Sequence, residues 1–213
     1  TDQQEAIASV RYGSTVVIAC PGSGKTAVAV ERIRRMLEAG EHWSSFVAVT
    51  FTNRAAGELL ERLGAGLGFC GTIHGLAHEV LKKGLGMAGG LAADFAVWDD
   101  AKREEMLGKV IGYHRLKTTV GQACGLLDRF VRGARWRSGA IPSLRSFVHA
   151  FDACEIYDTM KHRENAEDYN GLIDRALALL RANPGLLAYL KQRWRHVTVD
   201  EYQDVDPAQD ALI

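Results

Sequence analysis

The sequence predicts an α/β fold in which a parallel sheet is interrupted by a helical insertion, and three features lead to this prediction. An apolar, β-branched run at 14–19 enters the glycine-rich loop CPGSGKT at 20–26, and a helical pattern follows. A second β-branched run at 196–199 is followed by two acids. Between these runs, residues 99–193 repeat apolar side chains almost entirely at helical spacing. A helical block thus separates two strands of one sheet, which indicates an inserted domain and not a tail.

Composition narrows the class of protein. The 213 residues suffice for one or two domains with cores of their own, and 26 basic residues balance 26 acidic ones. This balance argues against a purely electrostatic nucleic-acid binder but leaves room for a local basic groove. No apolar run approaches the roughly 20 residues that span a bilayer, and no secretory signal opens the chain. The four cysteines lack metal-site or redox spacing, so we expect free thiols, a cytoplasmic location and no membrane partner.

The elements follow in a regular order. The first part is expected to contain helices over 3–10, 27–37 (ending near Gly40), 53–63 (capped by Asn53) and 72–82, with strands over 14–19 and 46–50. The glycine-rich stretch 84–90 indicates a boundary. Beyond it we expect helices over 99–111, 120–131, 143–160, 169–181 and 184–193, with Asp99 and Ser143 as N-caps and Pro184 in a first turn. The predicted domains are therefore 1–84, the insertion 85–195, and the return to the first domain at 196–213.

The loop at 20–26 is typical of a phosphate-binding loop. Its glycines let backbone N–H groups turn inward around phosphate oxygens, and the helix start adds its positive dipole end. Lys25 can reach the β- and γ-phosphates, and the Thr26 hydroxyl can bind Mg²⁺. The strict pattern has glycine where this chain has Ala19. The alternative interpretation is a chance glycine-rich turn, which the predicted strand and helix on either side of the loop disfavour. The expected nucleotide-binding residues of the loop are Pro21, Gly22, Ser23, Gly24, Lys25 and Thr26.

Two acids after the run at 196–199 predict the other half of this site. Asp200 would hold Mg²⁺, and Glu201 would orient or deprotonate the attacking water. Alone, the pair would be interpreted as solvated acids at a strand end. Lys25 and Thr26 upstream favour the catalytic interpretation.

Six segments follow one another along the chain: QQEAI at 3–7, the phosphate loop, VTFTNRAA at 49–56, GTIH at 71–74, DY..LI at 168–173 and VDEYQD at 199–204. They resemble, in order, motifs of the UvrD/Rep type of superfamily 1 DNA helicases, in which the first is the Q motif and the last is the DExQD box. Ala19 is common at its position in the family, and Arg54 replaces the family's usual lysine. Because the motifs occur in the family's order and cover nearly the whole chain, the resemblance is very specific.

The resemblance implies a P-loop NTPase with a RecA-like sheet (domain 1A) interrupted by the helical domain 1B, with ATP and Mg²⁺ as cofactors. It also implies movement along single-stranded DNA, typically 3′ to 5′. In the family a second RecA-like domain follows the DExQD box and supplies arginines that contact the γ-phosphate. We therefore expect this chain to be an N-terminal portion, truncated after the Walker B motif, that binds nucleotide weakly and is nearly inactive by itself.

Roles for single residues follow from the same resemblance. Gln3 aligns with the glutamine that reads the adenine edge, and Gln4 is the less favoured choice. Gln203 would couple the nucleotide site to DNA, because it lies two residues beyond Glu201; without the motif it would be taken for an ordinary loop amide. The residues expected to act in catalysis are Lys25, Glu201 and Gln203.

A set of polar and aromatic residues after two predicted strands is expected to bind DNA. Hydroxyl and amide groups there suit phosphate and sugar contacts. Phe51 either stacks on a base or packs against the sheet, and His74 either bonds to DNA or caps its helix. The basic stretch 129–137 is more simply a solvated helix end than a DNA contact. The expected DNA-binding residues are Thr50, Phe51, Thr52, Asn53, Thr72 and His74.

Three alternatives compete with a helicase motor. A helicase–nuclease would need a nuclease domain downstream. A non-motor module, in which ATP only sets the affinity for DNA, would have no need of Glu201. A small-molecule kinase with a helical lid would have no use for the segments at 50–56 and 200–204.

Overall fold

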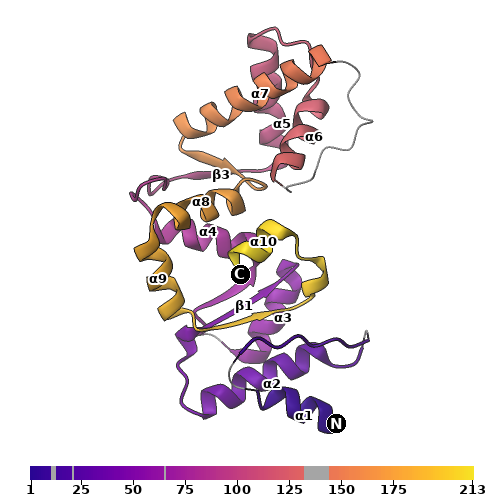
Figure 1. Ribbon diagram of the computed structural model, residues 1–213, viewed down its shortest axis with the longest axis vertical. Coiled ribbons are helices and arrows are strands. Elements are labelled where there is room, and N and C mark those ends of the chain that lie inside the picture. The colour runs from indigo at the N-terminus through magenta and orange to yellow at the C-terminus, as the bar shows by residue number, and fades with distance from the viewer. Residues whose placement is uncertain (11–12, 21, 65, 132–143) are drawn as a thin grey trace. The chain divides into compact units, whose positions relative to one another are not determined.

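The computed structural model describes residues 1–10, 13–20, 22–64, 66–131 and 144–213 (Figure 1). Pro21, Arg132, Arg135, Trp136, Arg137, Ser143 and the Arg129 side chain lie outside what is described. The chain divides into two compact units: Thr1–Leu76 with Gly185–Val205, the sheet unit, and Ala77–Pro184 with Asp206–Ile213, the helical unit. The domain bounds at 84/85 and 195/196 stay a prediction. No helix in the described ranges is long and apolar enough to cross a membrane.

The sheet unit is built on a parallel sheet with the strand order β2-β1-β5. The strands are β1 (Phe46–Thr50), β2 (Phe69–Thr72) and β5 (His196–Val199). All five residues of β1 are buried, as expected for a central strand that is covered on both faces. Because β2 and β5 both pair with β1 in parallel, the carboxyl ends of all three strands meet at one edge of the sheet.

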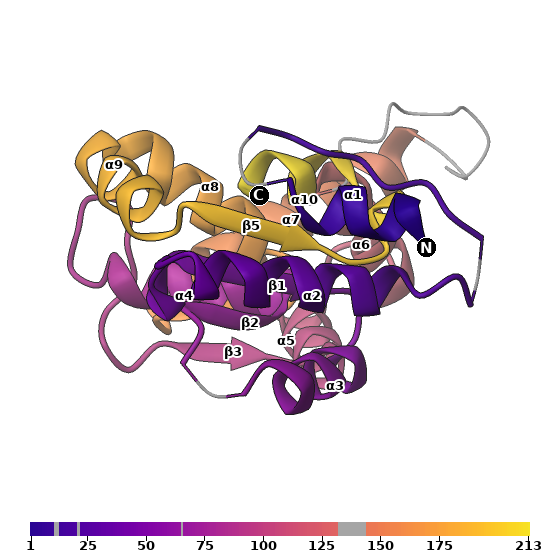
Figure 2. The same ribbon diagram turned by 90° about the horizontal axis from the view of Figure 1, so that it is seen from below.

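The sheet unit also contains helices, and the spacing of apolar residues in one of them sets how that helix packs. The helices are α1 (Asp2–Ala8), α2 (Lys25–Glu38), α3 (Asn53–Leu63) and most of α9 (Pro184–Arg193), with the 3₁₀ turns η1 (Trp43–Ser45) and η2 (Tyr202–Asp204). Val30, Ile33 and Met36 lie on one face of α2, and they share a buried cluster with Phe46 and Leu59. Figure 2 shows the ribbon of α2 beside the strands of the sheet. Their spacing of three residues therefore makes α2 a cover of the sheet.

In the sheet unit, the structure agrees with the predicted end of α2 but corrects the predicted cap of α3 and the predicted strand at 14–19. Gly40 follows α2 with φ +97°, which agrees with a glycine just beyond the helix end. Thr52, and not Asn53, caps α3, because the extended Thr52 accepts a hydrogen bond from the Ala55 N–H. The predicted strand at 14–19 is wrong: these residues pair with none of the described strands, and Ile18 is 95% exposed. An extended run becomes a strand only by pairing with a neighbour.

The helical unit confirms the predicted helices and adds a short pair of strands. The helices are most of α4 (Ile73–Lys83), α5 (Asp100–Tyr113), α6 (Val120–Val131), α7 (Leu144–Arg163), α8 (Leu172–Ala182) and α10 (Pro207–Leu212). As predicted, Asp99 caps α5 through the Lys102 N–H, and Pro184 opens α9. Sequence patterns did not predict the parallel pair β3 (Ala96–Trp98) and β4 (Ala166–Asp168). Three residues are too few to show an alternating pattern.

Buried charges hold part of the helical unit together. Lys161 pairs with Glu167, and its Nζ lies 3.3 Å from Asp168 Oδ2. The Tyr157 hydroxyl donates to Asp168 Oδ2 at 2.9 Å, and Asp168 Oδ1 accepts from the Gly171 N–H at 2.7 Å. The strand β4 is thereby tied to α7 and to the start of α8. We call Tyr157, Lys161, Glu167 and Asp168 the buried charge cluster, and each is at most 6% exposed.

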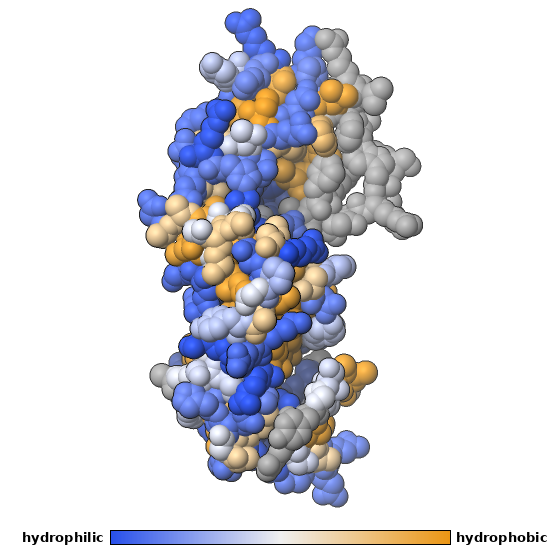
Figure 3. Space-filling model, turned by 60° about the vertical axis from the view of Figure 1, so that its left-hand side comes forward, coloured by the Kyte–Doolittle hydropathy of each residue, from blue (hydrophilic) through white to orange (hydrophobic). Residues whose placement is uncertain are grey.

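Burial and pairing act in opposite directions on these groups. Burial raises the pKa of the Glu167 carboxyl, although the Lys161 ammonium opposes this shift. Burial by itself would lower the pKa of Lys161, but the carboxylates of Glu167 and Asp168 outweigh it and raise that pKa. The cluster therefore keeps charges inside the fold by neutralising them locally. The outer face shown in Figure 3 is instead mostly hydrophilic, with small hydrophobic patches between.

Candidate nucleotide site

The phosphate loop leads directly into α2. Gly22 and Gly24 have φ values of +76° and +86°, which lie in the left-handed region that favours glycine. The Lys25 Nζ folds back on the loop and donates to the carbonyls of Ala19 at 3.1 Å and Cys20 at 3.4 Å. The lysine is thus held beside the loop backbone, and its contact with a phosphate stays a prediction.

Thr26 and Asp200 meet although 174 positions separate them: the Thr26 hydroxyl donates to Asp200 Oδ2 at 3.3 Å. The Asp200 N–H donates to the Val49 carbonyl at 2.9 Å, which continues the β1–β5 ladder and fixes where this carboxylate lies. The two residues that the sequence predicts as Mg²⁺ ligands are therefore side by side.

The chemistry of this pair suits Mg²⁺. Mg²⁺ prefers oxygen ligands, and it usually takes one or two carboxylates and completes its shell with waters and substrate phosphates. Thr26 and Asp200 offer a hydroxyl and a carboxylate. Within the described ranges, no group of three or more His, Cys, Asp or Glu side chains could hold a metal ion. The pair therefore fits a cation that binds together with a phosphate ligand.

Glu201 and Gln203 also come together. The Gln203 Nε2 donates to Glu201 Oε2 at 2.5 Å, and both side chains are exposed. Glu201 has φ +52°, a left-handed conformation that is uncommon for a residue with a side chain. Such backbone strain persists only where the surroundings impose it, and it gathers at functional sites. The carboxylate is thus held by an amide and remains open to water.

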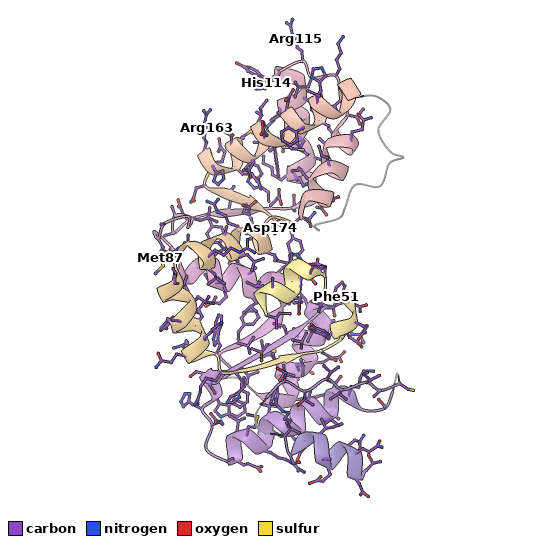
Figure 4. The ribbon with its side chains drawn as sticks, in the orientation of Figure 1. Phe51, Met87, His114, Arg115, Arg163 and Asp174 are labelled. Carbon is purple, nitrogen blue, oxygen red and sulfur yellow. The ribbon has the colours of Figure 1, made fainter. Side chains whose placement is uncertain are left out.

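The predicted DNA-binding residues divide into exposed and structural groups. Phe51 follows β1 and is 56% exposed (Figure 4), and Asn53 is exposed beside it. Thr50 is 1% exposed and donates to the Thr52 carbonyl, so its hydroxyl is used inside the protein. The Thr72 hydroxyl accepts from the Gly75 N–H at 3.1 Å at the start of α4.

His74, in the first turn of α4, is half-buried. Because β1 and β2 pair in parallel, all six of the predicted DNA-binding residues lie at or just beyond the carboxyl edge of the sheet. Their contact with DNA stays a prediction.

The start of the chain contains contacts that sequence reasoning missed. Gln3 is exposed on α1, whereas Gln4 donates to the Ser23 carbonyl of the phosphate loop at 3.0 Å. The Glu5 carboxylate accepts two hydrogen bonds from Arg35 on α2, at 2.6 and 2.9 Å, and this pairing lowers the pKa of Glu5. No spacing could have revealed these contacts, because the partners lie on different elements.

Comparison with known proteins agrees with this geometry. The family model of the UvrD/REP helicase N-terminal domain matches residues 1–213. The chain is 30% identical to the ATP-dependent DNA helicase UvrD1 of Mycobacterium bovis, over 99% of the chain and 29% of that protein. It is 32% identical to DNA helicase II of Escherichia coli, over 99% of the chain and 31% of that protein. It is 29% identical to the ATP-dependent DNA helicase Rep of the same organism, over 99% of the chain and 33% of that protein.

The chain therefore spans about a third or less of the length of these relatives. Its parallel sheet, phosphate loop and helical insertion confirm the predicted α/β class of RecA-like P-loop fold. With the motif order, the strand order and the family match in agreement, the chain belongs to the UvrD/REP helicase N-terminal domain family.

Proposed function

We propose that this chain is the nucleotide-binding part of an ATP-dependent DNA helicase or translocase that moves along single-stranded DNA. The observation that carries the proposal is the 3.3 Å contact between Thr26 of the phosphate loop and Asp200 at the end of β5. It supports a joint phosphate and Mg²⁺ site at the carboxyl edge of a parallel sheet, where α/β proteins bind ligands.

Each residue of the site has a distinct part in this proposal. The Lys25 ammonium exchanges its bonds to backbone carbonyls for bonds to the β- and γ-phosphates. Thr26 and Asp200 hold Mg²⁺, which neutralises charge on the phosphates when bound. The Glu201 carboxylate, held by Gln203, orients or deprotonates the water that attacks the γ-phosphate. Gln3 reads the adenine edge.

The proposed partners follow from the same edge of the sheet. Phe51 and Asn53 are exposed just beyond the carboxyl end of β1, which pairs with β5, and they would contact single-stranded DNA, with movement from 3′ to 5′. A second RecA-like domain of the same parent protein would supply arginines to the γ-phosphate, a contribution of about a thousandfold or more in related enzymes. The relatives are named as DNA helicases, which supports DNA as the partner. A role in DNA repair, replication or recombination, carried out in the cytoplasm, is part of the same proposal.

The test is ATP binding and hydrolysis by this chain, with and without single-stranded DNA, and with Lys25→Ala as the control. We expect nucleotide binding that Lys25→Ala removes and negligible turnover in both conditions. Unchanged affinity in Lys25→Ala would refute the phosphate site. Robust DNA-stimulated turnover by residues 1–213 would contradict the need for a second domain.

A further inference from the structure

The Gln4 side chain is held at both ends of its amide. The Gln4 Oε1 accepts a hydrogen bond from the Thr1 nitrogen at 3.0 Å, and the backbone N–H of Gln4 donates to the Thr1 hydroxyl. These two bonds form a capping box at the start of α1. The Gln4 Nε2 donates to the Ser23 carbonyl at 3.0 Å. Because the cap engages the oxygen, the nitrogen faces the phosphate loop.

The Ser23 carbonyl has a direct bearing on phosphate binding. A phosphate loop works by aiming backbone N–H groups inward, so its carbonyls must face outward and find partners there. The peptide between Ser23 and Gly24 is planar and trans, and its C=O and N–H therefore point in opposite directions. With the Ser23 carbonyl held toward Gln4, the Gly24 N–H points away from Gln4.

Gly24 gives independent evidence of how closely Gln4 approaches the loop. A Cβ atom built on Gly24 would lie 3.3 Å from Gln4 Nε2, and the φ of +86° already disfavours any other residue. The Gln4 amide thus packs directly against the turn that opens α2. Both of its polar ends are used within the protein, which leaves the exposed Gln3 as the residue available to adenine.

We propose that Gln4 is a positioning residue that holds the phosphate loop with the Gly24 N–H directed at the nucleotide phosphates. This inference rests on the proposed function of the loop. Gln4 acts on the phosphates of any nucleotide, whereas Gln3 acts on the base, so the two neighbouring glutamines have separable effects.

Two substitutions separate loop positioning from helix capping. Gln4→Glu keeps an acceptor for the capping box but removes the donor to Ser23. Gln4→Met keeps the length of the side chain without donor or acceptor. Ala6→Glu places the same added charge at an exposed site on α1 and serves as the charge control. Thermal unfolding of each variant checks that the fold is kept.

The measurement is the dissociation constant of Mg–ATP and of Mg–GTP for each variant by titration calorimetry. A lost hydrogen bond of about 1 kcal/mol predicts roughly fivefold weaker binding of both nucleotides in both Gln4 variants, with the ATP:GTP ratio unchanged. Gln3→Ala should instead change that ratio.

Three results would overturn the inference. The first is wild-type affinity in both Gln4 variants, and the second is a loss of affinity confined to ATP. The third is an equal loss of affinity in Ala6→Glu and Gln4→Glu with none in Gln4→Met. Lys25→Ala distinguishes a failure of the Gln4 role from a failure of the nucleotide site. If Lys25→Ala weakens binding and the Gln4 variants do not, only the role of Gln4 fails. If Lys25→Ala has no effect either, the proposed nucleotide site fails together with it.

Discussion

The candidate nucleotide site of the sheet unit and the buried charge cluster of the helical unit use charged side chains in opposite ways. In the sheet unit, Glu201 is exposed at a strand end, and Lys25 donates to the backbone carbonyls of Ala19 and Cys20. In the helical unit, Lys161, Glu167 and Asp168 are buried and pair with one another. A charge that is already neutralised inside the protein contributes to the fold, whereas one left beside weak partners remains available to a ligand.

This difference predicts which substitutions affect folding and which affect function. Removing a member of the buried charge cluster leaves its partners buried without compensation. Removing a side chain of the nucleotide site leaves mostly solvated groups behind. The following predictions test this contrast, from the largest expected effect to the smallest.

Lys161→Met should destabilise the helical unit by about 3–5 kcal/mol, because it leaves the Glu167 and Asp168 carboxylates buried without their cation. Burial raises the pKa of Glu167 and the Lys161 ammonium opposes this shift, so without Lys161 the folded state takes up a proton at Glu167 at a higher pH than the unfolded chain does. The loss should therefore be largest at pH 8 and shrink as the pH falls toward the ordinary carboxyl pKa. Denaturant unfolding at several pH values measures it.

The exposed Lys102 provides the matched control, since it pairs with Glu105 on the surface of α5 at 3.1 Å. Lys102→Met should leave stability nearly unchanged. Equal losses of stability from Lys161→Met and Lys102→Met would contradict the contrast between buried and surface charges.

Glu201→Gln should keep nucleotide affinity and thermal stability while turnover falls by about 10²–10⁴-fold in the whole protein that carries this chain. The amide keeps the shape of the side chain but accepts no proton. Steady-state hydrolysis with and without single-stranded DNA measures the loss, and calorimetry checks binding. Turnover at the wild-type rate would exclude Glu201 as the base.

Thr26→Ala should weaken Mg–ATP binding by about tenfold, because one oxygen ligand and one hydrogen bond to Asp200 are lost. Binding of ATP in excess chelator should change little. Thr26→Ser keeps the hydroxyl and should bind as the wild type does. An equal effect of Thr26→Ala with and without Mg²⁺ would argue that the residue does not contact the cation.

Thiol labelling gives a contrast between the units without substitutions. Cys20 is exposed in the loop, whereas burial raises the pKa of the Cys154 thiol in α7 to about 12. An aromatic disulfide reagent at pH 8 should modify Cys20 readily and Cys154 only after unfolding, since the thiolate is the reactive form. Mg–ATP should slow the reaction at Cys20. Rapid labelling of Cys154 in the folded protein would contradict its burial.

The sequence by itself predicted the strands β1 and β5 and most of the helices, and it proposed the main site residues, because these signals are local. Helical spacing, Asp99 as a cap and Pro184 in a first turn are each encoded within a few residues. Parallel pairing then brings strand ends to one edge, so Thr26 and Asp200 could be predicted as neighbours from motifs far apart in the chain.

Only the tertiary structure decided which groups pair over a distance. The run at 14–19 has the composition of a strand but pairs with none in the described ranges, while the short strands β3 and β4 form without any periodic signal. Lys161 finds its carboxylates, and Gln4 finds Ser23, through the packing of separate elements. Hydrogen bonds and ion pairs of this kind depend on geometry between distant residues, which spacing along one chain does not encode.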